Sequence, residues 1–97
     1  MKRINLKREA CQFAENEDIA KRLREEVVLP STQSKKDLVI DFTGVEGTTQ
    51  SFVHALISDC IRRNPESLDV IVFKGCNGFV QTFVETVVEY SQLQSNA

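Results

Sequence analysis

Three short apolar segments of the 97-residue chain have the pattern of β-strands. In the first, Ile4 and Leu6 alternate with polar residues, which is typical of a strand with one exposed face. The segments 38–42 and 70–73 are nearly continuous apolar runs rich in β-branched residues, and this pattern indicates strands covered on both faces. We therefore expect the first strand at an edge of the sheet, the other two inside it, and both Phe42 and Phe73 buried.

Three segments with helical spacing of apolar residues alternate with these strands. The first begins after Asn16, a good N-cap, and Pro30 predicts its end, so that residues 30–36 form a loop. The second spans roughly 50–63, and the third begins near Phe79 and ends at about 90–92. On the second helix, the residues opposite the apolar face predict an exposed stripe: Ser51, His54, Ser58 and Arg62.

The resulting order, β-α-β-α-β-α, is typical of an α/β domain with a mainly parallel sheet packed by helices. The length suits one small domain, residues 1–97, with an ordered core of about 3–92 and a frayed tail at 93–97.

Composition excludes several classes of function. The net charge of −2 gives no strong positive field for nucleic acid or anionic lipid, and no apolar run approaches the ~20 residues of a membrane span. Three widely spaced cysteines and a single histidine lack the spacing of a zinc site, so we expect no metal and no cofactor. An odd number of cysteines with no leader-like segment suits a reducing cytoplasm.

The candidate chemistry lies in the polar segment Gly47-Thr48-Thr49-Gln50-Ser51, between the second strand and the second helix. Thr48 or Thr49 is a natural N-cap. The segment lacks the lysine of a phosphate-binding P-loop. Ser51 and His54 share a helix face, but nucleophilic catalysis also needs an orienting acid and an oxyanion hole. No residue is therefore predicted to be catalytic, while a hydroxyl at a helix start remains a candidate phosphoacceptor.

The segment "LVIDFTGVEGTTQSF" resembles the strand–turn–helix signature of STAS domains, the family of bacterial anti-sigma-factor antagonists. It is closer to the compact STAS-like family of unknown function, and the similarity extends over residues 37–90. The matching positions are Asp41, Phe42, Thr43, Gly44, Val45, Ser51 and Phe52.

This resemblance implies a STAS-like fold and an interaction module rather than an enzyme. In STAS antagonists, a partner kinase of the histidine-kinase-like ATPase fold phosphorylates a Ser or Thr at this helix start, and the phosphate switches partner binding off. Here the aligned acid and phosphoacceptor positions hold Thr49 and Gln50, and Phe52 replaces a glycine.

We therefore expect a non-catalytic, cytoplasmic bacterial regulatory domain that binds a protein partner, with an ATPase of that fold as the candidate. The predicted contacts are Thr48, Thr49, Gln50 and Ser51, also the candidate phosphoacceptor region, and the helix face His54, Ser58 and Arg62. The alternative is a small anionic ligand or nucleotide bound at the same helix N-terminus. A homodimer through the edge strand or an apolar helix surface is also open.

Overall fold

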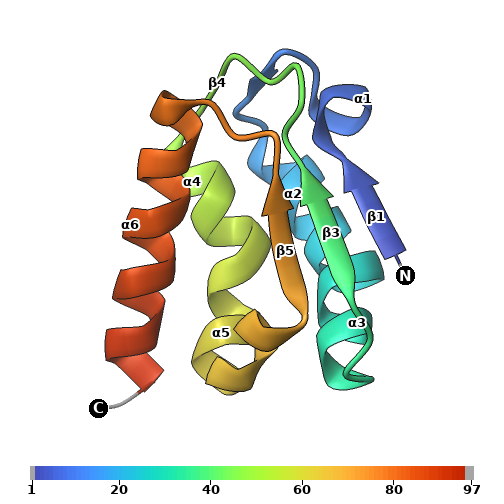
Figure 1. The fold of residues 1–97 in the computed structure, drawn as a ribbon, viewed down its shortest axis with the longest axis vertical. Helices are drawn as coiled ribbons and strands as arrows, with labels where there is room; N and C mark the ends of the chain where they lie inside the picture. Colours follow the sequence, from blue (N-terminus) through green and yellow to red (C-terminus); the bar gives the residue numbers. More distant parts are fainter. Residues whose placement is uncertain (1, 96–97) are drawn as a thin grey trace.

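The computed structural model describes residues 2–95 and has the expected alternation of strands and helices (Figure 1). In chain order the elements are β1 (Lys2–Asn5), α1 (Leu6–Ala10), β2 (Phe13–Ala14), α2 (Glu17–Leu23), the π-helical segment η1 (Arg24–Val28), α3 (Leu29–Gln33), β3 (Leu38–Asp41), β4 (Gly47–Thr48), α4 (Gln50–Val53), the π-helical segment η2 (His54–Ser58), α5 (Asp59–Arg63), the 3₁₀ helix η3 (Pro65–Asp69), β5 (Ile71–Lys74) and α6 (Gly78–Ser95).

The main sheet has the strand order β1-β3-β5, and both pairs are parallel. Leu38 of β3 lies opposite Ile71 of β5, so the two segments predicted to run side by side do so. The first strand lies at an edge, as expected. The prediction that segment 70–73 lies inside the sheet is wrong, because β5 forms the other edge. Beyond the carboxyl ends of these strands, β2 and β4 form a two-residue parallel pair that the sequence pattern did not predict.

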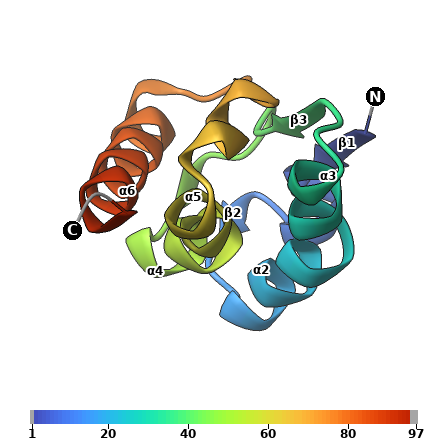
Figure 2. The ribbon, with the colours of Figure 1, turned by 90° about the horizontal axis from the view of Figure 1, so that it is seen from below.

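Helices α2, α3, α4 and α5 lie on one face of the sheet, as Figure 2 shows when the molecule is seen from below. The strand order advances in one direction, so right-handed crossovers place the helices that connect the strands on the same side. The prediction that segment 70–73 is covered on both faces is therefore wrong: Val72 is 53% exposed, and Phe73 is only partly buried. Phe42 is fully buried, as expected.

The helices differ from the sequence prediction mainly at two points. The prediction that the helix ends at Pro30 is wrong, because helical structure continues to Gln33. The π-helical segment η1 comes just before the proline, and its altered hydrogen bonding accommodates a residue that has no backbone N–H to donate. The first strand ends at Asn5, whose side chain accepts a hydrogen bond from the Arg8 amide and caps α1, so Leu6 begins a helix.

The other helix boundaries agree with the sequence or extend it. Helical structure spans residues 50–63 without interruption, as predicted, although η2 forms its centre. The last helix continues to Ser95, beyond the predicted end at 90–92. Of the tail predicted to fray, residues 96 and 97 lie outside the described residues.

Candidate functional site

The predicted site lies at the carboxyl ends of the parallel strands, where the connections that follow β1, β3 and β5 meet. This edge is where open α/β sheets usually place their functional groups. The connection from β3 to α4 is tied to the segment before β2 by a hydrogen bond from the Glu46 amide to the Gln12 carbonyl, 2.8 Å long.

Asp41 fixes the start of this connection. Its carboxylate accepts a hydrogen bond of 2.9 Å from the Thr43 amide and forms an ion pair with Arg3 at 3.6 Å. Hydrogen bonds from Thr43, together with the charges of Arg3 and Lys74, lower the pKa of Asp41 and keep it ionised. The contact between residues 41 and 43 is an Asx turn, so Asp41 holds the loop and is not free to act on a ligand.

Asn77 joins this connection to the last helix, and sequence reasoning assigned it no role. Its side-chain amide donates to the carbonyls of Val45 and Glu46 at 3.4 and 3.0 Å, and its carbonyl oxygen accepts from the Val80 amide at 2.8 Å. The chain approaches closely here, since a Cβ on Gly75 would lie 2.6 Å from the Thr43 nitrogen. The sequence feature that indicates this role is the Asn-Gly pair before an amphipathic helix, because asparagine is a favoured N-cap residue.

The structure divides the polar segment 47–51 into a buried part and an exposed part. Thr48 is buried, and its hydroxyl donates to the Ala14 carbonyl at 2.7 Å, so its predicted place on an outward-facing surface is wrong. Thr49 is the N-cap, and its hydroxyl accepts a 3.1 Å hydrogen bond from the Phe52 amide. Gln50 and Ser51 follow in the first turn, and both are exposed. The hydrogen bonds of Thr48 and Thr49 therefore hold the exposed residues Gln50 and Ser51 in place.

The helix face that was predicted to be exposed is not a continuous surface in the structure. His54 and Arg62 are exposed, but Ser58 is fully buried and its hydroxyl oxygen accepts a 2.9 Å hydrogen bond from Ser91 of α6. The wider turn of η2 changes the angle between successive side chains, so a helix face assigned at 3.6 residues per turn does not carry through to Ser58. Arg62 pairs with Asp59 one turn earlier and lies at the other end of this helix.

A shallow, open depression surrounds the exposed first turn. Four side chains line it, and they come from the beginnings of two helices: Glu17, Gln50, Ser51 and His54. The two helix starts are brought together because they follow β2 and β4, which pair with each other. The sequence pattern does not predict that Glu17 lies beside this helix start, since two-residue strands leave no periodic signal. We call these four residues the α4 surface.

The α4 surface contains a hydroxyl, an imidazole and a carboxylate, but they are not linked in the way that nucleophilic catalysis requires. Among residues 2–95, no hydrogen bond joins the side chains of Ser51, His54 and Glu17 to one another. No group of three or more His, Cys, Asp or Glu residues in that range could hold a metal ion. Within the same range, no helix is both long and apolar enough to cross a membrane.

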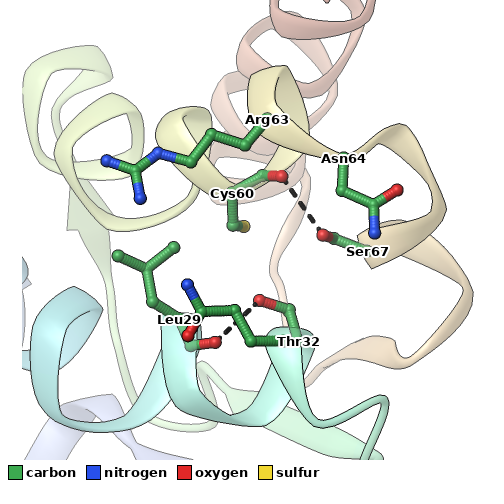
Figure 3. A pocket seen from close by; sticks show the side chains of 7 residues that line it. Leu29, Thr32, Cys60, Arg63, Asn64 and Ser67 are labelled. Carbon is green, nitrogen blue, oxygen red and sulfur yellow. Dashed lines mark hydrogen bonds between the residues drawn. The ribbon is translucent and has the colours of Figure 1, made fainter.

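A second hollow lies between α3 and α5, away from the polar segment (Figure 3). Its volume is about 50 Å³, well below the ~300 Å³ at which pockets for organic ligands begin. The hydroxyls around it are already paired, since Ser67 donates to the Cys60 carbonyl and Thr32 to those of Val28 and Leu29. Burial raises the pKa of the Cys60 thiol to about 11, so this cysteine is an unreactive core residue.

Comparison with known proteins places the fold. A model of the family described as "STAS-like domain of unknown function (DUF4325)" matches residues 20–87, which cover β3, β5, the polar segment and most of α6. Searches of curated proteins and of solved structures each found no match.

Proposed function

The chain belongs to the family of STAS-like domains of unknown function, and on this premise we propose that it is a non-catalytic bacterial regulatory domain whose α4 surface binds a protein partner. The observation that carries the proposal is the exposed pair Gln50–Ser51, held on an anchored helix start beside His54 and Glu17. The helix start coincides with the position at which STAS antagonists, which this chain resembles, meet their partner kinase. An ATPase of the histidine-kinase-like fold is therefore the candidate partner.

The anchoring supports a binding role. Thr49 caps the helix, Thr48 is bonded to Ala14, and Asn77 holds the preceding turn to α6. A surface that is already fixed loses little conformational entropy when a partner binds, and this lowers the cost of association. The exposed groups offer hydrogen-bond donors and acceptors together with one negative charge, and such groups confer specificity on an interface.

A narrower version of the proposal adds phosphorylation of Ser51. Of the three hydroxyls in the segment, Thr48 is buried and Thr49 is engaged as the cap, which leaves Ser51 exposed in the first helical turn. The helix start would tolerate a phosphate, while the added charge beside Glu17 would change what the α4 surface binds. Intact-mass measurement of protein purified from its host tests this version. We expect one added phosphate that Ser51→Ala removes, and its absence under all growth and stress conditions would contradict the idea.

The alternative ligand, a small anion or nucleotide, has to lie against the carboxylate of Glu17, and this charge disfavours it. A thermal-shift series with phosphate and nucleotides distinguishes the two functions. A ligand at about 100 times its dissociation constant adds about 2.7 kcal/mol of stability. We expect no shift with these compounds.

Affinity capture from the host lysate tests the proposed function, with the unmodified domain as the reference. Gln50→Lys and Ser51→Glu place a new charge on the α4 surface, and the matched control Gln33→Lys places one at the exposed end of α3. We expect both surface variants to lose the partner that the reference and the control retain. Retention of every partner by Gln50→Lys and Ser51→Glu, with unchanged circular dichroism, would show that the surface is wrong.

A further inference from the structure

The last helix, α6, carries an apolar stripe that faces away from the core. Phe79 is 62% exposed, Tyr90 is 52% exposed and Leu93 is 66% exposed, and they account for three of the five large hydrophobic side chains exposed among the described residues. Phe83 lies between them, partly buried, with its ring edge-on to that of Phe79 at 5.3 Å. Exposed aromatic groups gathered on one element are unusual for a monomer and mark an interaction site.

The stripe borders the face that α6 buries in its own domain, and Phe83 also packs against the core. The buried face consists of Val80, Val84, Val87 and Ser91, which pack against the layer formed by α4 and α5. The exposed residue Thr86 also belongs to the stripe. Its positions are therefore 79, 83, 86, 90 and 93, with intervals of 4, 3, 4 and 3 residues. This is the spacing of a helix–helix seam. Figure 1 shows α6 at the edge of the molecule, with no element on its outer side.

We propose that the stripe packs against the same stripe of a second copy, as an antiparallel pair of α6 helices with a two-fold axis at Thr86. The stripe is close to symmetric about this residue, because Phe79 and Leu93 are equally distant from it and Phe83 and Tyr90 nearly so. An antiparallel pair therefore sets Phe79 beside Leu93 of the second copy and Phe83 beside its Tyr90. Thr86, the smallest member, lies where the two helices approach most closely.

The area suits a second copy rather than a large obligate assembly. Large aromatic side chains bring about 150–250 Å² each into an interface when fully buried, so the exposed fractions leave about 450 Å² per copy in the stripe. Two copies with their flanks bury about 1,000 Å² in total, which is the lower limit for a specific interface. We therefore expect a weak, reversible dimer and not an obligate one.

Sedimentation velocity from about 1 to 500 µM tests the dimer with two matched variants. Tyr90→Glu introduces a charge on the stripe, and Val72→Glu introduces the same charge at the exposed apolar residue of the sheet. We expect Tyr90→Glu to weaken association at least tenfold and Val72→Glu to leave it unchanged. A monomer at every concentration, or a dimer lost only with Val72→Glu, would overturn the proposal.

Cross-linking tests the position of the axis. In a background with Cys11→Ser and Cys76→Ser, which leaves only the buried Cys60, we compare Thr86→Cys with Glu85→Cys on the polar side of the helix. Mild oxidation is expected to give a disulfide-linked dimer with Thr86→Cys and little with Glu85→Cys. Equal yields from the two variants would contradict a two-fold axis at Thr86.

Discussion

A hydrogen bond between Ser58 and Ser91 joins the helix 50–63 to α6, beside their apolar contacts, and it offers a sharp test of the fold. Both side chains are fully buried, and their hydroxyl oxygens lie 2.9 Å apart. Replacement of either serine by alanine leaves the other hydroxyl buried without this partner. Leaving a buried polar group unsatisfied costs about 1–3 kcal/mol.

Removal of both hydroxyls should cost much less than the two single changes together. Two methyl groups of nearly the same shape replace the pair, and such a replacement is close to neutral. We therefore expect Ser58→Ala and Ser91→Ala each to lower the free energy of unfolding by about 1–3 kcal/mol, and the double variant to lie within about 1 kcal/mol of the unmodified protein. In a domain of this size, 1 kcal/mol shifts the midpoint of thermal unfolding by about 4–8 °C.

Urea unfolding followed by far-ultraviolet circular dichroism measures the four proteins of this cycle. The exposed serine Ser34 provides a control, since Ser34→Ala removes a hydroxyl that is in contact with water. Additive losses in the double variant, within about 0.5 kcal/mol, would refute the buried pair. A Ser58→Ala variant as stable as the unmodified protein would instead place Ser58 on the exposed helix face that its spacing from His54 predicts.

Three further changes test the connections around the site. Phe42→Ala empties a fully buried position and should lower the free energy of unfolding by about 3–5 kcal/mol in urea; a loss below about 1 kcal/mol would contradict its place in the core. Bonds from Thr43 lower the folded-state pKa of Asp41, so its contribution is present above the unfolded pKa of about 4 and is lost as the pH falls through the lower folded-state value. Asp41→Asn should therefore destabilise at pH 7 and flatten the acid side of the stability profile, and an unchanged profile would contradict this role. Gly75→Ala places a methyl group at positive φ against Thr43 and should cost more than about 1 kcal/mol, whereas Gly78→Ala meets nothing within 4 Å and should not; equal effects would show that the close approach is absent.

The sequence predicts the helix 50–63 and the parallel pairing of β3 with β5 because both have strong local signals. Thr49 caps one end of the helix, and Asn64 with Pro65 ends the other. Each of these two strands is a short run rich in β-branched residues, and right-handed connections leave little choice of direction. Asp41 entered the prediction only as a position that matches the STAS-like signature, and its Asx turn with Thr43 is found in the structure.

The features that the sequence does not predict depend on contacts between distant segments or on a change of helix period. The π segments place Pro30 inside a helix and turn Ser58 toward α6, and apolar spacing read at 3.6 residues per turn misses both effects. Thr48 has the composition of an exposed cap and is buried only because β2 pairs with β4. Glu17 joins the α4 surface through the same pairing. Strands of two residues have no sequence pattern from which this pairing could be predicted.

The most direct measurement is the affinity of the purified domain for its captured partner, determined by calorimetry for the unmodified protein, Gln50→Lys, Ser51→Glu and the control Gln33→Lys. A new charge at the centre of an interface commonly costs about 2 kcal/mol or more. We expect at least a tenfold loss of affinity for both changes on the α4 surface and none for the control. Four equal dissociation constants would contradict the assignment of Gln50 and Ser51 to the partner interface.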